Sequence, residues 1–488
     1  MLKIDLSSKR SRLALRFFTY GVMTMSTLAL TTVVVFIMLG YRMDRGFVFS
    51  QGGLIQLRSF PSSATVTVDG KKQNSRTPSK VDIKSGQHTL GMSLEGYRPW
   101  SKTIDISPGQ LLWLNYTRLI PKSITTTGLH TFDNLVGTLN SPDHRWLLAQ
   151  TAADSPNFVL VDFNNEKKPE YTNLQLPDGL LTKKDNKYGK LELLEWDYGS
   201  RYVLIQHRNG DVNELIRLDR AKPQESVNIT RVFSLNISEA HFSATNPNLV
   251  FAKTDEVLRR LDLANTNASA ALVTNLKSFV VYGEDTVVFV NEQDKTVDDP
   301  TTRQQAVGIY RHGKIAIVRT VPLGPSISVA YNEYDNHSYL ALGFSNSAQI
   351  DILRDPTANG PKDADVFNYF DLGAPPDLLS FSSNGRMLLA NHGKQIITFD
   401  VDQNKYYAAK LDASTSPPSL HWLDDFHIWT DAGGKFSVLE FDGQNTTYIT
   451  NVTPNFAAQI SASGRQLFTI NKSVDGKFLL QVSNLTTE

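Results

Sequence analysis

Few side chains in this sequence have the type and spacing that catalysis requires. Two pairs of adjacent aspartates, Asp298-Asp299 and Asp424-Asp425, are the clearest candidates for acid/base chemistry or for holding a metal ion. Adjacent residues in a strand point to opposite faces, and aspartates in turns are usually solvated. We therefore expect both pairs to be turn residues without a catalytic or metal-binding role.

Three other polar residues, Glu195, His241 and His421, each precede a large aromatic residue. If all three lay on strands facing one channel, a carboxylate and two imidazoles would meet there and could exchange protons. The simpler interpretation is that each is hydrogen-bonded between packed parts of the fold, as buried polar groups usually are. We favour the simpler interpretation, and predict no catalytic, cofactor-binding or metal-binding residue.

The sequence also lacks the motifs of common enzyme classes. It contains no GxSxG elbow, HExxH helix, P-loop, EF-hand loop or dinucleotide fingerprint. The absence of cysteine excludes thiol nucleophiles, thiolate metal sites and disulfides. Together these absences predict a protein that is not an enzyme and carries no cofactor.

One long apolar run predicts how the chain is held in place. Residues 17–41 contain no charged residue and are long enough, at about 1.5 Å per residue, to cross a hydrocarbon core of about 30 Å as a helix. Their hydroxyl side chains can bond back to the helix backbone, as we expect of Thr24, Ser26, Thr27, Thr31 and Thr32. A cleaved signal peptide is the alternative, but its apolar region is shorter and ends in small residues. We favour a retained transmembrane helix.

Charge predicts the orientation of this helix. Residues 1–16 form a basic tail with a net charge of +4, so the rest of the chain carries −4, because the whole sequence sums to zero. An excess of Lys and Arg marks the cytoplasmic side, which places the tail inside and the body outside the cytoplasm. A slightly acidic body is not expected to bind nucleic acid. The expected partners are the membrane, through residues 17–41, and a protein or glycan of the cell envelope.

After a linker at 42–51, residues 52–121 read as a small antiparallel β domain. Short alternating strands are separated by turn pairs such as Asp69-Gly70 and Glu95-Gly96. The segment resembles a PEGA domain at Pro61, Ala64, Val66-Thr67-Val68-Asp69-Gly70-Lys71, Thr77-Pro78, Gly86-Gln87-His88-Thr89-Leu90, Gly96-Tyr97 and Trp100.

The segment departs from the PEGA pattern at two turns. Ser63 stands where the naming motif has Gly, and Asn74 or Ser75 stands where a Gly often precedes Thr-Pro. Ser and Asn are acceptable in turns, so the resemblance still implies the PEGA fold. The matching residues are turn and core residues, so the resemblance implies no binding site.

Residues 122–488 repeat one hairpin pattern eight times: an apolar or aromatic residue, a polar turn and an apolar strand. The copies begin at Leu139, Trp196, Phe242, Tyr282, Tyr331, Phe381, Trp422 and Ile460. Their spacing of about 38 to 57 residues brackets one four-stranded propeller blade. We predict an all-β body with an eight-bladed propeller. Seven blades stay possible because the copy at Tyr282 is weak, and a pair of β-sandwiches is the alternative architecture.

The repeats resemble WD40-like and TolB-like propellers, whose blades carry an S-P-D-G-K/R turn. Ser141-Pro142-Asp143 and Asn384-Gly385-Arg386 match it in part, and no WD dipeptide stands at the blade ends. Residues 141–146 are also similar to the Asp-box of sialidases, but they lack its Gly and its Trp spacing. The resemblance therefore implies the fold and no catalytic site.

Three polar segments, residues 164–190, 291–305 and 354–365, are expected to be long loops suited to recognition, although such loops are often merely mobile. The second joins the second and third strands of its blade, on the face that also carries the blade-to-blade connections. We expect this face to bind the partner. The resulting hypothesis is a membrane-anchored envelope protein, with the PEGA unit as a juxtamembrane or wall-interacting module and the propeller as a recognition platform. The alternative is an extracytoplasmic hydrolase of polysaccharide or peptide built on the propeller, with two carboxylates about 5 to 10 Å apart in a central pocket.

Overall fold

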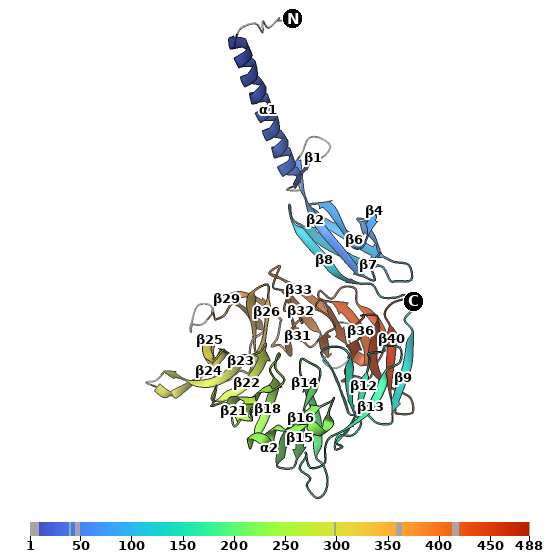
Figure 1. The fold of residues 1–488 in the computed structure, drawn as a ribbon, viewed down its shortest axis with the longest axis vertical. Coiled ribbons are helices and arrows are strands. Elements are labelled where there is room, and N and C mark those ends of the chain that lie inside the picture. The colour runs from blue at the N-terminus through green and yellow to red at the C-terminus, as the bar shows by residue number, and fades with distance from the viewer. Residues whose placement is uncertain are drawn as a thin grey trace. The chain divides into compact units, whose positions relative to one another are not determined.

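The computed structural model describes residues 9–38, 41–43, 49–296, 299–357, 364–411 and 419–487. Contacts divide the chain into two units, which separate in the sequence between Ser123 and Ile124. The first unit contains the long helix α1 and a small β domain, and the second unit is built almost wholly of strands (Figure 1). We describe each unit by itself.

The helix α1 (Lys9–Met38) carries the apolar run, and its part Leu13–Met38 is long and apolar enough to cross a membrane. Such a helix is compatible with a membrane anchor or a signal sequence. The hydroxyls of Thr24, Thr27, Thr31 and Thr32 donate to the carbonyl four residues earlier, as expected, and Thr19 does the same. The helix begins before the expected residue 17, because the preceding Leu, Ala and Arg residues are good helix formers.

The β domain consists of two four-stranded sheets. One contains β1 (Tyr41–Met43), β2 (Phe49–Phe60), β5 (Ser79–Lys84) and β8 (Leu111–Arg118). The other has the order β4 (Lys71–Arg76), β3 (Thr65–Val68), β6 (Gly86–Ser93) and β7 (Trp100–Ile106). Every second residue of β7 is buried, so one face of that sheet covers the core.

Two features of this domain differ from the prediction of a linker at 42–51 followed by an antiparallel β domain. The β2 and β8 pair runs parallel, whereas the other pairs are antiparallel. Part of the expected linker 42–51 is strand, because β1 pairs with the beginning of β2, with Tyr41 opposite Gln51. Tyr41 therefore belongs to β1 and not to the helix.

The turn that carries the PEGA motif is fixed by Thr77, which is 3% exposed. Its hydroxyl accepts a hydrogen bond from the Ala64 amide at 2.9 Å and shares another with the Ser59 hydroxyl at 2.6 Å. Its carbonyl accepts from the Ser63 amide at 2.7 Å. Ser63 has a φ of 69°, the left-handed conformation that Gly adopts without strain. Thus Ser63 keeps the backbone of the Gly that it replaces.

The second unit is a ring of eight four-stranded antiparallel blades, as predicted. Blades 1 to 4 comprise, from the first strand to the last, β10 (Gly137–Asn140), β11 (Trp146–Gln150), β12 (Asn157–Asp162), β13 (Glu170–Gln175); β14 (Lys190–Trp196), β15 (Tyr202–Asn209), β16 (Val212–Asp219), β17 (Val227–Asn228); β18 (Ile237–Phe242), β19 (Leu249–Thr254), β20 (Val257–Asp262), β21 (Asn267–Ala268); and β22 (Leu276–Tyr282), β23 (Thr286–Thr296), β24 (Asp299–Arg311), β25 (Lys314–Pro322). A short helix, α2 (Ile229–Phe233), follows blade 2.

The remaining blades complete the ring. Blades 5 to 8 comprise β26 (Ile327–Tyr334), β27 (His337–Phe344), β28 (Gln349–Arg354), β29 (Val366–Asp371); β30 (Leu378–Phe381), β31 (Met387–His392), β32 (Gln395–Asp400), β33 (Lys405–Lys410); β34 (Leu420–Trp422), β35 (His427–Thr430), β36 (Lys435–Glu440), β37 (Thr447–Asn451); and β38 (Gln459–Ile460), β39 (Gln466–Lys472), β40 (Phe478–Asn484), β9 (Thr126–Phe132). Because β9 is the outermost strand of blade 8, the two ends of the propeller sequence close the ring within one sheet.

Apolar side chains fill the spaces between neighbouring blades. Phe163 of blade 1 stacks on Phe468 of blade 8, with ring centroids 4.0 Å apart. The first strand of each blade is innermost, because first strands of successive blades contact one another, as β10 and β14 do.

Two of the three polar segments contain strands where loops were expected. Residues 291–305 belong to a hairpin that extends β23 and β24, with Asp294 opposite Arg303, so the expected loop is absent there. Residues 164–190 contain β13, the outermost strand of blade 1. The segment 354–365 joins β28 to β29, and its residues 358–363 lie outside the described part of the chain.

A candidate binding pocket at the centre of the ring

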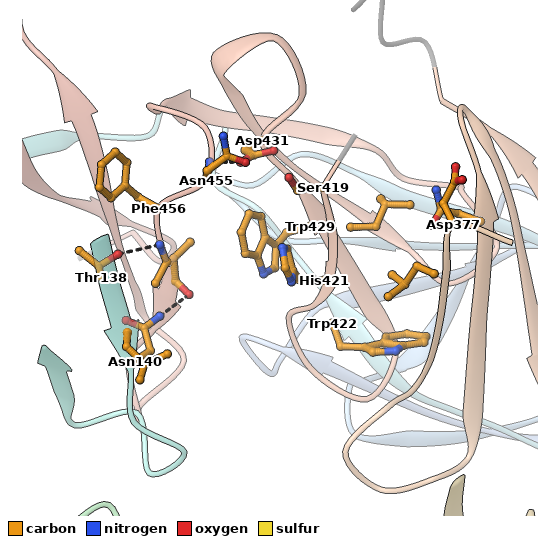
Figure 2. A pocket seen from close by; sticks show the side chains of 16 residues that line it. Thr138, Asn140, Asp377, Ser419, His421, Trp422, Trp429, Asp431, Asn455 and Phe456 are labelled. Atoms are coloured by element: carbon orange, nitrogen blue, oxygen red, sulfur yellow. Dashed lines mark hydrogen bonds between the residues drawn. The ribbon is translucent and has the colours of Figure 1, made fainter. Parts of the chain in front are cut away.

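A pocket of about 730 Å³ lies where the innermost strands of blades 6, 7, 8 and 1 approach one another (Figure 2). It is lined by Thr138, Leu139, Asn140, Asp377, Leu378, Asn391, Ser419, Leu420, His421, Trp422, Trp429, Asp431, Asn455, Phe456, Ala457 and Ala458. Its volume falls within the range of about 300 to 1,000 Å³ that is typical of small-molecule sites. Most of the lining residues lie at the ends of strands or in the linker before β38. The packed blades of the ring hold these residues in place.

Aromatic rings form the centre of the lining. His421 of β34 stacks on Trp429 of β35, with centroids 4.5 Å apart and an interplanar angle of 25°. Trp429 also stacks on Phe436 at 4.9 Å. The Trp422 indole nitrogen donates to the Ser380 carbonyl at 3.3 Å, which fixes that ring against blade 6. Figure 2 shows His421, Trp422 and Trp429 gathered from blade 7.

Side chains of blade 1 hold the linker that forms one wall. The Thr138 hydroxyl accepts from the Ala457 amide at 2.9 Å, and the Asn140 amide donates to the Ala458 carbonyl at 2.8 Å. Both bonds appear in Figure 2. Blade 1 therefore holds the linker that precedes β38. Asn455 and Phe456 belong to this linker, so their backbone is held next to the pocket.

The charge of the lining is negative. Asp377 and Asp431 are its two carboxylates, and no Lys or Arg lines the pocket among the described residues. Asp431 is 4% exposed and accepts from the Asn455 amide at 2.9 Å. Asp377 accepts from the Gly393 amide at 2.8 Å. Desolvation by the surrounding protein lowers the pKa of His421, although the nearby Asp431 carboxylate opposes this shift, which favours the neutral imidazole.

The strand order indicates the edge of the ring toward which several lining residues lie. In an antiparallel blade, the start of the first strand and the end of the second lie at the same edge. Leu378 and Leu420 start first strands, whereas Asn391 lies near the end of β31 and Asp431 follows β35. These four residues thus lie toward the edge that carries the blade-to-blade connections, whereas Asn140 and Trp422, the last residues of β10 and β34, lie toward the opposite edge. By the same rule, the extended hairpin of β23 and β24 projects from the edge that carries the connections.

The structure brings together two of the three polar residues singled out in the sequence. Glu195 Oε2 lies 2.9 Å from His241 Nδ1, and Glu239 Oε1 lies 3.5 Å from His241 Nε2. Burial lowers the pKa of His241, but the two carboxylates outweigh this effect and raise the pKa to about 9. This group ties blade 2 to blade 3, as the simpler interpretation predicted. His421 belongs to the separate pocket described above.

Asp424 and Asp425 lie in the turn between β34 and β35, as expected, whereas Asp299 is the first residue of strand β24, so the expectation of a turn was wrong there. Asp424 accepts from the His427 amide at 2.9 Å and from its ring at 2.8 Å, which closes the turn between β34 and β35. Asp425 accepts from the Ser383 hydroxyl at 2.7 Å and so joins blade 7 to blade 6. Asp298 and the side chain of Asp299 lie outside the described residues. Within the described ranges, no group of three or more His, Asp or Glu side chains is placed to hold a metal ion.

Sequence reasoning missed a buried network around Glu214 in blade 2. This carboxylate accepts from the Thr182 amide at 2.9 Å, the Thr182 hydroxyl at 2.7 Å, Asn228 at 3.0 Å and Arg231 at 2.9 Å. The fifth hydrogen bond to this carboxylate comes from His207 Nδ1 at 2.9 Å. Burial raises the pKa of Glu214, but these hydrogen bonds outweigh it and lower the pKa to about 2.

The tautomer of His207 follows from its second contact. His207 is fully buried, and its Nε2 accepts from the Gly189 amide at 3.1 Å, so the ring proton is on Nδ1 and is donated to Glu214. The network therefore holds the connection between blades 1 and 2 and the helix α2 against the blade. The four residues that contact Glu214 are spread over positions 182 to 231. No short sequence spacing therefore predicts this network.

Comparison with known proteins identifies the small domain. Residues 53–119 match the family model of the PEGA domain. A search of curated proteins finds no match for the chain. Among solved structures, the Dos1 propeller is similar at 11% identity with a TM-score of 0.45, over 75% of this chain and 95% of that one.

Two enzymes are also among the similar structures. The dihydro-heme d1 dehydrogenase NirN has 13% identity and a TM-score of 0.43, over 65% of this chain and 66% of NirN, which is just under two thirds. The tricorn protease has 11% identity and a TM-score of 0.40, over 74% of this chain and 38% of the protease. With the strand pairing above, the family match leads to one conclusion: the chain contains a PEGA domain at residues 53–119, followed by an eight-bladed β-propeller.

Proposed function

We propose that this chain is a membrane-anchored binding protein of the cell envelope. The observation that carries this proposal is the pocket at the centre of the ring, with its aromatic centre and its polar rim. The helix Leu13–Met38 supports the anchoring part of the proposal, and the basic residues before it support an extracytoplasmic body. The propeller recognises an envelope ligand, and the PEGA domain is a juxtamembrane module.

The recognition surface is the edge that carries the blade-to-blade connections, toward which four residues of the pocket lie. The extended hairpin of β23 and β24 projects from the same edge, and rigid propellers commonly bind their partners through the loops at one end. A ligand that contacts these four residues and a larger partner held by the hairpin would therefore lie on the same side of the ring. This arrangement suits a polymer of the envelope or a protein attached to it.

A glycan hydrolase is the second candidate, because the pocket contains two carboxylates, Asp377 and Asp431. They come from different blades, and each accepts a hydrogen bond from a backbone amide. Hydrolysis would require one of them to be protonated and to reach the scissile oxygen. Release of reducing ends from envelope glycan by the full chain, lost in Asp377→Asn and Asp431→Asn, would favour the hydrolase over the binding protein.

Labelling and cross-linking in intact cells test the proposed function. Because the chain has no cysteine, Asp335→Cys and Ser8→Cys each introduce a single thiol, one in the propeller and one in the basic tail. A membrane-impermeant maleimide is expected to label Asp335→Cys in intact cells and Ser8→Cys only after permeabilisation. Cross-linking mass spectrometry is then expected to recover envelope partners. Labelling in the reverse order, release of the chain from membranes by carbonate, or recovery of no envelope partner would overturn the proposal.

A further inference from the structure

We propose that the central pocket binds an amino sugar that carries a free ammonium group, as a unit of an envelope glycan. This inference rests on the proposed function and names the ligand class for the same pocket. Three features of the lining support it: its charge, its aromatic rings and its neutral hydrogen-bonding groups.

The charge of the lining favours a cation. Asp431 is buried at 4% exposure, and its polar contact is the backbone amide of Asn455, since no described Lys or Arg forms an ion pair with it. A buried carboxylate is costly unless a charged or hydrogen-bonding partner compensates it. Asp377, on the neighbouring blade, adds a second negative charge to the lining. An ammonium group bound there gains charge-assisted hydrogen bonds that a neutral ligand cannot make.

The neutral state of His421 strengthens this preference. A protonated imidazole in the lining would supply the positive charge itself and would repel a cationic ligand. The protein atoms around His421 desolvate its ring and lower its pKa, while part of the residue stays open to the pocket; stacked on Trp429, the imidazole acts as a flat aromatic surface. The lining thus keeps its negative charge at neutral pH.

The rings offer surface to both parts of an amino sugar. Trp429 is only 7% exposed between its stacking partners, so the rings left accessible are His421, which is exposed, and Trp422 and Phe456, which are half-buried. A cation above an aromatic face is attracted by the ring quadrupole. The C–H groups of a sugar ring also pack on such faces by burying apolar surface.

The polar rim favours a sugar over the amine of a lysine side chain. Asn391, Asn455 and Ser419 line the pocket and provide neutral donors and acceptors around the rings. Sugar hydroxyls donate and accept hydrogen bonds, so they can satisfy these groups. A lysine side chain brings only methylene groups behind its ammonium and offers these groups no hydrogen bonds, although Asn391 already donates to the Gly393 carbonyl at 3.4 Å.

Binding of paired probes tests this inference. The full chain, purified in detergent, is titrated calorimetrically with the glucosamine trimer and with the N-acetylglucosamine trimer, which differ only in the acetyl groups that remove the charge. We expect the glucosamine trimer to bind about tenfold more tightly. Asp431→Asn should abolish this preference, whereas Asp335→Asn, the same change in the turn between β26 and β27, should retain it. Trilysine is the third probe.

Each outcome decides the inference. Equal affinity for the two trimers, tighter binding of the acetylated trimer, binding of neither trimer, or tighter binding of trilysine than of the glucosamine trimer would overturn it. The comparison of probes on the unmodified chain needs no variant, so it stands even if Asp431→Asn fails to fold. If the probes fail while cross-linking still recovers envelope partners, the ligand class is wrong and the proposed function is retained. If the chain is not anchored outside the cytoplasm, the proposed function itself is wrong.

Discussion

Glu195 Oε2 lies 2.9 Å from His241 Nδ1, and this contact joins the innermost strands of blades 2 and 3. The amide of Phe242 donates to the other oxygen of Glu195, so the carboxylate is held by both the side chain and the backbone of β18. With Glu239 on the second ring nitrogen, His241 is charged in the folded chain under physiological conditions.

This contact predicts a loss of stability in mild alkali. The pKa of His241 is about 9 in the folded chain and about 6.5 in an unfolded one. The stabilisation is therefore complete below about pH 6.5 and is lost as the pH rises through about 9. The melting temperature should fall across this interval in the unmodified chain and more shallowly in His241→Gln. Parallel pH profiles for the two proteins would show that the contact does not stabilise the ring.

A second prediction concerns Glu214, whose carboxylate accepts five hydrogen bonds. Glu214→Gln removes the charge and replaces one acceptor by a donor, so we expect it to lower the free energy of unfolding by about 2 to 4 kcal/mol. Glu192→Gln is the matched control in the same blade, because its pair with Arg208 at 3.2 Å is exposed and should contribute only about 0 to 1 kcal/mol. Urea unfolding measures both. Similar losses in the two variants would contradict the role of the network.

Acid should remove the contribution of Glu214 in a defined interval. Its pKa of about 2 in the folded chain is lower than the usual 4.5, so its contribution is present above about pH 4.5 and is lost as the pH falls through about 2. The difference in melting temperature between the unmodified chain and Glu214→Gln should therefore shrink from pH 4.5 downward. A difference that does not change over this interval would be inconsistent with the lowered pKa.

A third prediction concerns Ser63 in the PEGA domain. A left-handed conformation costs a residue with a side chain about 1 to 2 kcal/mol, whereas Gly adds about 0.4 to 1 kcal/mol of entropy to the unfolded chain. Ser63→Gly should therefore stabilise the domain by about 0.5 to 1 kcal/mol. Ser62→Gly is the control, since Ser62 has no positive φ and should gain nothing. Hydrogen exchange of residues 53–119 in rising urea measures both. Equal effects of the two changes would refute the assignment of strain to Ser63.

A fourth prediction concerns the extended hairpin of blade 4. Gln293 stands directly opposite Gln304, so replacing residues 294–303 by Asn-Gly leaves a two-residue turn between paired residues. Strand β25 pairs with β24 only from Gln304 onward, so the removed part has no third strand beside it. The melting temperature should change by less than about 2 °C, and capture of envelope partners should fall. Unchanged capture would show that the hairpin is not part of the recognition surface.

Much of the propeller could be predicted because its inner strands are buried on both faces. Strands such as β11, with five consecutive buried residues, leave a continuous apolar run after each polar turn. The outermost strands were not recognised, because β33 and β13 expose most of their residues and carry little apolar pattern. The closing role of β9 depends on its pairing with β40, which is remote in the sequence.

The pocket could be predicted only in part, for the same reason. His421 was singled out as a residue of an innermost strand, and the structure places it in the lining. Its companions come from positions as distant as Thr138 and Phe456, so the sequence offers no spacing that links them. Strand order alone did predict the edge that carries the turn between β23 and β24, because it determines which connections share an edge.

Site-specific photo-cross-linking from the pocket shows whether the envelope ligand binds there. Phe456 lines the pocket and is replaced by p-benzoylphenylalanine in intact cells. Tyr198, which is 75% exposed in the turn between β14 and β15 and is not among the lining residues, receives the same replacement as a control. Binding through the pocket predicts that envelope glycan is cross-linked from position 456 and not from 198, and that excess glucosamine trimer suppresses the product. Equal products from the two positions, or none from 456, would contradict it.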